Sequence, residues 1–360
     1  MTKNYPYPEH TPTTRNQLPC EPARVAGNMI PKLRGVRYRL LPGWGRGLLW
    51  GSLCIVGLLG VAYVALGVHV IVSCGLPPGT QGGSALSSAR GKALPDLLAP
   101  TRSLTASWPL IIGHSGSAYW CRRNTLGCLA RSLALGATML EVDIRLSADD
   151  YLVAFHDADV DYQTNGTGAV RALTREQLRA LHLGREVTPP EVAADEPLQS
   201  WRIALLDEVR QEFPQTPLLL DVKAPKPPMD AALVAFVQRF EARDFDRIYI
   251  KTRNQRLANR LRRLPQPPGT GLTLCERIAF VAFPGLVTSP PGLLDLPLWL
   301  VSPALVQRAT AAGHLVVVSQ VNDTQDLHKA LALPGLFGVV TDRPDVAFQV
   351  QRLSYHRMKW

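Results

Sequence analysis

Short apolar runs that end at ionisable residues recur along the second two thirds of this 360-residue chain. One run leads into His114, the next into Glu141 and Asp143, and a third, residues 151–155, into His156. Apolar runs of this length bounded by polar turns are typical of buried strands. Ionisable groups are costly inside a core unless they are paired or bind a metal. These residues therefore indicate strand ends at the mouth of a barrel or sheet, where catalytic groups gather.

Strand-like and helix-like segments alternate through the same part of the chain. The pattern predicts strands at 110–112, 139–146, 151–155, 218–222, 247–251, 298–301, 314–321 and 338–341. It predicts helices at 124–135, 230–243, 254–264 and 324–333. Repeated strand–helix units favour an α/β fold, a (β/α)8 TIM barrel, with a doubly wound open sheet as the second choice. Residues 184–200 and 265–296 give no clear pattern.

An uncharged apolar stretch precedes this part of the chain. From Gly47 to Cys74 there is no Asp, Glu, Lys or Arg, and a run of this length is enough to cross a bilayer. A cleaved signal peptide is the rival interpretation, but a polar segment of 46 residues stands before the stretch. Basic residues flank it closely on the N-terminal side only, the last being Arg46. The positive-inside rule then predicts a single-pass membrane protein with a cytoplasmic N-terminus and its large domain on the periplasmic or extracellular side.

Composition divides the chain into four parts. Residues 1–46 are basic, with eight Lys and Arg against two Glu, and have the composition of a disordered cytoplasmic tail. Residues 47–74 form the expected transmembrane helix, residues 75–100 a linker rich in Gly and Pro, and residues 101–360 the barrel. The tail holds +6 of the net charge of +10, which favours contact with anionic lipid. It carries no recognisable nucleic-acid motif, so no nucleic-acid partner is expected.

Two cysteines lie beside the first strand end. Cys121 and Cys128 are seven residues apart and do not have the spacing of a zinc site. They could pair in an oxidising compartment, and separate thiols are an equal alternative.

Seven short motifs follow one another in a defined order. They are His114-Ser115-Gly116, Arg123-Asn124-Thr125, Glu141-Val142-Asp143, Phe155-His156-Asp157, Thr164 to Gly168, Asp221-Val222-Lys223 and the closing residues 338–345. In this order the motifs resemble those of the glycerophosphodiester phosphodiesterase family, over residues 109–346. The resemblance implies a (β/α)8 barrel of the phospholipase-C-like phosphodiesterase type, in agreement with the alternating pattern.

The resemblance also implies an activity, which is hydrolysis of glycerophosphodiesters to glycerol 3-phosphate and an alcohol. It assigns His114 and His156 as general acid and base, and histidine suits both roles near neutral pH. It assigns the phosphate contact to Lys223. Glu141, Asp143 and Asp221 are the implied ligands of one divalent cation, and their hard oxygen atoms suit Mg²⁺ or Ca²⁺.

Two positions depart from the family pattern. Ser115 stands where the family has an arginine, and Arg123 where it has a glutamate. A serine cannot copy the bidentate grip of a guanidinium on phosphate. Our hypothesis is that Arg123, or the adjacent Arg122, supplies the missing guanidinium, and the alternative is that both are solvated loop residues.

Two other functions remain open at this point. The Asp221-Val222-Lys223 strand and the Gly-His opening without arginine are similar to those of the related sphingomyelinase D enzymes. Cleavage of lysophospholipid or sphingolipid headgroups, a lysophospholipase D type of reaction, is therefore an alternative. A non-catalytic membrane-anchored barrel is the other alternative, and the retained carboxylates and histidines argue against it.

Overall fold

The computed structural model describes residues 62–69, 109–184, 201–223, 227–239, 247–284 and 289–358. Residues 62–69 are helical and belong to the expected transmembrane segment, whereas the rest of that segment, the tail and the linker lie outside the described residues. Among the described residues, no helix combines the length and the apolar character needed to cross a bilayer.

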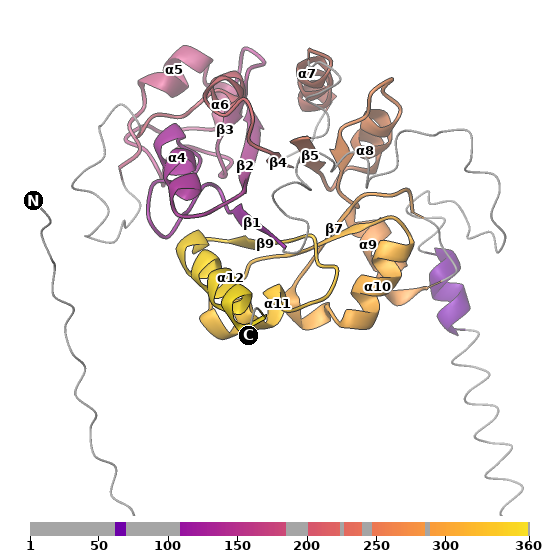
Figure 1. Ribbon diagram of the computed structural model, residues 1–360. Helices are drawn as coiled ribbons and strands as arrows, with labels where there is room; N and C mark the ends of the chain where they lie inside the picture. The colour runs from indigo at the N-terminus through magenta and orange to yellow at the C-terminus, as the bar shows by residue number, and fades with distance from the viewer. Residues whose placement is uncertain are drawn as a thin grey trace, which may run out of the picture. The chain divides into compact units, whose positions relative to one another are not determined.

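Eight parallel strands form the centre of the fold (Figure 1). They are β1 (Leu110–Gly113), β2 (Met139–Leu146), β4 (Leu218–Val222), β5 (Ile248–Lys251), β6 (Gly269–Thr270), β7 (Leu293–Leu296), β8 (Leu315–Val318) and β9 (Gly338–Thr341). Their order is β6-β5-β4-β2-β1-β9-β8-β7, and β3 (Leu152–Ala154) pairs antiparallel with β2. A parallel bridge between Gly271 and Leu293 connects the two ends of this order. The sheet is therefore a nearly closed (β/α)8 barrel, as the alternating pattern predicted.

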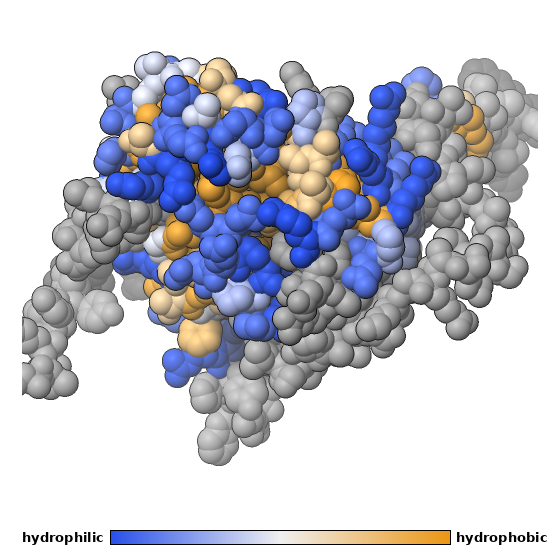
Figure 2. Space-filling model, turned by 90° about the horizontal axis from the view of Figure 1, so that it is seen from above, coloured by the Kyte–Doolittle hydropathy of each residue, from blue (hydrophilic) through white to orange (hydrophobic). Residues whose placement is uncertain are grey.

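Helices follow the strands on the outside of the barrel; most lie between one strand and the next, and the last follows β9. They are α4 (Leu126–Ala134), α5 (Arg175–Ala180), α6 (Leu206–Glu212), α7 (Pro227–Val237), α8 (Gln255–Arg262), α9 (Leu274–Ala282), α10 (Pro303–Ala311), α11 (Thr324–Leu331) and α12 (Pro344–Met358). Several begin at a capping side chain: Thr125 accepts from the Cys128 N–H, and Asp323 from two backbone N–H groups of α11. Seen from above, a pale apolar patch lies over α7 among polar residues (Figure 2).

The inward faces of the strands explain where the functional groups lie. Buried apolar side chains form one cluster inside the barrel: Leu110, Ile112, Met139, Leu219, Tyr249, Leu293, Val317 and Val340. Side chains two positions apart on a strand share a face. Two positions after seven of these residues, the chain carries His114, Glu141, Asp221, Lys251, Asp295, Ser319 and Asp342. The barrel interior thus changes from an apolar floor to a polar layer toward the carboxyl ends of the strands, the face where TIM barrels carry their sites.

One predicted strand is wrong. Residues 298–301 do not form a strand, because Leu298–Leu300 is a 3₁₀ turn that follows β7. Pro297 precedes this turn, and its carbonyl accepts from the Leu300 N–H at 3.0 Å. A proline cannot donate to a strand ladder, so β7 ends before it.

Candidate active site at the carboxyl ends of the strands

Three carboxylates meet where β2 and β4 run side by side. Glu141 and Asp143 share one face of β2, and Asp221 on β4 is the register partner of Asp143. One oxygen atom of each lies within 4.8 Å of the others. Glu141 and Asp143 are buried, and Asp221 is partly buried. The structure therefore brings the three predicted metal ligands into one cluster.

Ser115 and Asn124 hold this cluster from the loop after β1. The Ser115 N–H donates to Glu141 Oε2 and its hydroxyl to Asp143 Oδ2, both at 2.7 Å. The Asn124 amide donates to Asp143 Oδ2 at 2.8 Å and accepts from the Asp143 N–H at 3.0 Å. Both residues are buried and have positive φ, 48° for Ser115 and 60° for Asn124. Ser115 thus orients carboxylates, a role that its place in the motif did not indicate.

Two lysines approach the same carboxylates. The Lys223 ammonium lies 2.9 Å from both Asp143 Oδ1 and Asp221 Oδ2. Lys251, the register partner of Asp221 on β5, lies 3.4 Å from Asp221 Oδ2 and 2.7 Å from Asp295 Oδ2. Burial opposes the charge of each ammonium, but the carboxylates outweigh it and raise the pKa of both lysines. Lys251 and Asp295 belong to no motif, and only their positions at strand ends could have indicated them.

His114 is fixed by one residue directly after β9 and one in the segment after β8. A carboxylate can only accept, so the His114 Nδ1–H donates to Asp342 Oδ1, at 2.7 Å. The Gln320 amide nitrogen lies 2.8 Å from His114 Nε2. Burial would lower the pKa of His114, but the bond to Asp342 and the charge of Glu141 outweigh it and raise that pKa. Asp342, which belongs to the closing motif at residues 338–345, is the partner that orients this histidine.

His156 has a matching arrangement. Its Nδ1–H donates to Asp157 Oδ1 at 2.6 Å, and Gln163 Nε2 donates to the other oxygen of Asp157 at 2.6 Å. Arg145 Nε donates to the His156 carbonyl at 2.8 Å. An aspartate on Nδ1 fixes the tautomer and leaves Nε2 for another partner. Both predicted histidines therefore carry the same local arrangement.

The two loop arginines differ in their surroundings. Burial raises the pKa of Asp157 and of Asp342, but the hydrogen bond from each acid's histidine outweighs it and lowers that pKa. The charge of Arg123 lowers both values further. One guanidinium thus acts on the aspartates of both histidines. Arg122 instead lies over the Trp201 ring, 4.4 Å from its centroid. A disulfide between Cys121 and Cys128 closes the loop that carries both arginines and Asn124.

On the hypothesis that Arg123 contacts the phosphate, Arg123→Ala should lower kcat/KM by about 10- to 100-fold, the loss of one charge-assisted hydrogen bond. Arg122→Ala should leave turnover nearly unchanged and lower the free energy of unfolding by about 0.5–1 kcal/mol, the loss of one cation–π contact. Steady-state kinetics on a phosphodiester and chemical denaturation measure the two effects. Unchanged kinetics in both variants would rule out a phosphate contact by either arginine.

The electrostatics of the acid cluster fit a divalent cation. Burial, followed by the charge of Asp143, raises the pKa of Glu141 to about 8. Asp143 has a lowered pKa, because Lys223 and the hydrogen bonds from Asn124 and Ser115 outweigh its burial. A bound cation stabilises the ionised form of a buried carboxylate that its neighbour repels, and an all-oxygen donor set suits a hard cation. Glu141, Asp143 and Asp221 would hold it.

This arrangement predicts a pH dependence of stability. Without divalent cations, folded Glu141 holds its proton up to a pKa of about 8, against 4.5 for the unfolded chain. Between these values the folded state binds more protons, so stability should fall as pH rises, by at most about 1.4 kcal/mol per pH unit. Glu141→Gln keeps the acceptor for the Ser115 N–H and should remove this slope. Denaturation of both proteins in chelator, at a series of pH values, gives the difference between their free energies of unfolding. Burial lowers the pKa of His314, which makes an opposite contribution to stability, but this contribution is the same in both proteins and cancels in the difference. Parallel curves would contradict the assignment.

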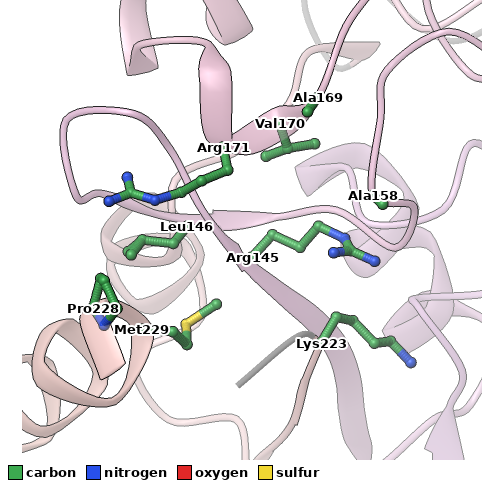
Figure 3. Close-up of a pocket in the computed structure, with 9 residues that line it drawn as sticks. All are labelled: Arg145, Leu146, Ala158, Ala169, Val170, Arg171, Lys223, Pro228 and Met229. Carbon is green, nitrogen blue, oxygen red and sulfur yellow. The ribbon is translucent and has the colours of Figure 1, made fainter. Parts of the chain in front are cut away.

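A cavity of about 280 Å³ adjoins the lysine side of the cluster. In Figure 3 the charged ends of Arg145 and Lys223 lie on one side of it and Arg171 lies on the other. Leu146, Val170 and Met229 contribute apolar lining. Lys223 also contacts Asp143 and Asp221, so the cavity shares a wall with the acid cluster.

Comparison with known proteins agrees with this geometry. A family model, the glycerophosphoryl diester phosphodiesterase family, matches residues 113–346. A putative glycerophosphodiester phosphodiesterase of Bacillus subtilis is 32% identical over 114 residues, 31% of this chain and 44% of its own length. A lysophospholipase D of Rattus norvegicus is 24% identical over 262 residues, 65% of this chain and 83% of its own length. The matches to the first curated relatives span less than half of those proteins.

Solved structures show the same fold. The glycerophosphoryl diester phosphodiesterase domain of a Mycobacterium tuberculosis protein superposes with a TM-score of 0.57 at 20% identity, covering 68% of this chain and 99% of that one. An Oleispira antarctica phosphodiesterase, in complex with the product sn-glycerol-3-phosphate, gives 0.54 at 20% identity and covers 69% and 98%. The family model covers well over half of the chain, and the motifs it spans meet at one mouth. This chain therefore belongs to the glycerophosphoryl diester phosphodiesterase family.

Proposed function

We propose that this chain hydrolyses glycerophosphodiesters to glycerol 3-phosphate and an alcohol. The observation that carries the proposal is the pairing of each motif histidine with an aspartate, His114 with Asp342 and His156 with Asp157, at the mouth that holds the acid cluster. A phosphodiester needs one group to take a proton from the attacking hydroxyl and another to protonate the leaving oxygen. Two oriented imidazoles supply both near neutral pH.

The remaining groups bind or neutralise the negative charge of the substrate phosphate. Glu141, Asp143 and Asp221 would hold Mg²⁺ or Ca²⁺, which stabilises the charge that develops on the phosphoryl oxygens. Lys223 and Arg123 contact those oxygens, Lys223 from the position directly after β4 and Arg123 from the disulfide-closed loop. Ser115 and Asn124 keep Asp143 ionised and in place through their hydrogen bonds.

The reaction has two steps in which the histidines exchange roles. In the first, one imidazole takes the proton of the glycerol hydroxyl next to the phosphate, and that oxygen bonds to phosphorus. The bond from phosphorus to the headgroup oxygen breaks, and the other imidazole, protonated, gives its proton to the departing alcohol. In the second, water opens the cyclic phosphate with the proton transfers reversed. The aspartates hold each ring through Nδ1 in both steps.

Phosphorus NMR tests this route directly. With glycerophosphoethanolamine, the full-length chain and a divalent cation should produce glycerol 3-phosphate, and a cyclic glycerol phosphate should appear before it. Formation of ethanolamine phosphate would place the cleavage on the other side of phosphorus and contradict the assignment of the leaving group. No phosphorus-containing product in Mg²⁺ or Ca²⁺ would favour the non-catalytic barrel.

The membrane arrangement is part of the same proposal. The uncharged stretch from Gly47 to Cys74 and the basic residues before it support a single-pass anchor, with the barrel on the periplasmic or extracellular side. The bilayer would then be a partner of the chain. Protease added to cells or spheroplasts that have no outer membrane should remove the barrel and spare the tail, and protection of both parts would contradict this orientation.

Cleavage of lysophospholipid headgroups is the second candidate function. The rat relative named lysophospholipase D supports it.

A further inference from the structure

Lys251 connects the acid cluster to a carboxylate on the far side of β6. Its ammonium lies 3.4 Å from Asp221 Oδ2 and 2.7 Å from Asp295 Oδ2. Asp221 is on β4 and Asp295 on β7, so the lysine side chain reaches past the two-residue strand β6. A Cβ atom at Gly271, directly after β6, would lie only 3.3 Å from Lys251 Cα. A glycine at this position therefore avoids crowding the lysine.

The surroundings of Asp295 keep it negatively charged. Its side chain is only 7% exposed, and a buried carboxylate is costly unless it is paired. Its Oδ2 pairs with Lys251, and its Oδ1 accepts a hydrogen bond from the Ser319 hydroxyl. Burial raises the pKa of Asp295, but Lys251 and Ser319 outweigh it and lower that pKa. Lys251 therefore faces a full negative charge on Asp295.

Two ammonium groups contact the carboxylates that would hold a cation. Lys223 lies 2.9 Å from both Asp143 Oδ1 and Asp221 Oδ2, whereas Lys251 is nearer to Asp295 than to Asp221. An ammonium opposes the binding of a cation to the carboxylate that it contacts, because charges a few ångströms apart interact strongly in a partly buried site. Asp295 lies outside the group of three ligands. It therefore offsets the charge of Lys251 without taking a ligand from the cation.

We propose that Asp295 is a positioning residue that balances the charge of Lys251, so that this ion pair sets the affinity of the acid cluster for a divalent cation. The inference rests on the proposed function, because it concerns the cation of the same site. Without the charge of Asp295, the charge of Lys251 acts on Asp221 unbalanced, and cation binding should weaken. Without the charge of Lys251, an additional carboxylate lies near the cluster, and cation binding should strengthen.

Titration calorimetry with Mg²⁺ and with Ca²⁺ on the full-length chain tests the pair. Asp295→Asn should weaken cation binding by about 10- to 100-fold, the range for a lost outer partner of a metal site. Lys251→Met should strengthen binding by about 10-fold, because it removes a positive charge beside a ligand. The double variant removes both charges and should return the affinity to within about three-fold of the wild type.

An exposed ion pair supplies the matched control. Lys329→Met and Asp326→Asn remove the same two kinds of charge from a pair on α11 whose side chains are 66% and 46% exposed. Both variants should leave cation affinity unchanged. Circular dichroism checks the folding of every variant, and a gain of affinity in Lys251→Met cannot come from a loss of folding.

Three results would overturn the proposal. The first is weaker binding in both single variants and in the double variant, which would assign the pair to holding β5 and β7 together. The second is wild-type affinity in both single variants, and the third is no cation binding by the wild type. Phosphorus NMR with glycerophosphoethanolamine on the same wild-type sample reads the proposed function separately. Hydrolysis with unchanged affinities in the variants would remove the pair and keep the function, whereas the predicted affinities without hydrolysis would keep the pair and remove the function.

Discussion

Replacing His114 with alanine is expected to lower kcat by about 10²- to 10⁴-fold, the range for loss of one general acid or base. KM should change little, because Lys223 and Arg123, rather than the imidazole, contact the phosphate in the proposed site. His156→Ala should have an effect of the same order. Steady-state kinetics on glycerophosphoethanolamine measure both losses.

Two further variants separate catalysis from folding. Asp342→Asn keeps a partner for the His114 Nδ1–H but removes the charge, so it should move the pKa of that histidine downward in the pH–rate profile. His328→Ala removes an exposed histidine on α11 and should leave kcat unchanged. A His114→Ala protein that retains a tenth or more of wild-type kcat would remove His114 from the chemical step.

Asp143→Asn is expected to weaken divalent-cation binding by at least about 100-fold, since loss of an outer partner alone costs 10- to 100-fold. The carboxylate lies at the centre of the cluster, with Ser115, Asn124 and Lys223 all bonded to it. Removing its charge also leaves Asp221 as the one carboxylate paired with the Lys223 ammonium in the part of the chain that the structure describes. Titration calorimetry with Mg²⁺ and with Ca²⁺ measures the affinity, and turnover should fall with it.

A matched control accompanies this variant. Asp326→Asn removes a carboxylate whose side chain is 46% exposed on α11 and should leave cation affinity unchanged. Circular dichroism shows whether Asp143→Asn still folds. Ser115→Ala offers a milder test, because it removes the hydroxyl that donates to Asp143 Oδ2 and keeps the carboxylate. Cation affinity in Asp143→Asn equal to that of the wild type would move the cation to other ligands.

The sequence pattern was most reliable for the long parallel strands. The ranges 139–146, 218–222 and 338–341 coincide with β2, β4 and β9. Residues 218–220 and 338–340 carry no polar side chain, as a strand buried on both faces requires, whereas 139–146 alternates apolar residues with Glu141, Asp143 and Arg145. The segment 265–296 resisted prediction, since β6 has two residues and its ladder depends on β5 rather than on local pattern. The strand predicted at residues 298–301 was wrong for a related reason, because an apolar run alone does not distinguish a strand from a packed turn.

The candidate site divides in the same way. Residues inside short motifs, such as His114 and Asp221, could be named from the sequence, and they meet in the structure. Lys251 and Asp295 lie in no motif, so only their positions at strand ends could have indicated them, and the relation of Gln320 to His114 comes only from barrel closure. Ser115 was read as a lost arginine, whereas it holds Glu141 and Asp143, a role visible only once the loop conformation is known.

The most direct test of the whole account is the return of activity on cation addition. The full-length chain, treated with chelator and then titrated with Mg²⁺ or Ca²⁺, should regain glycerophosphoethanolamine hydrolysis with saturation, and Asp143→Asn should not regain it at the same concentrations. Full activity in the chelated protein, or the same titration curve for Asp143→Asn, would contradict a cation-dependent phosphodiesterase site at Glu141, Asp143 and Asp221.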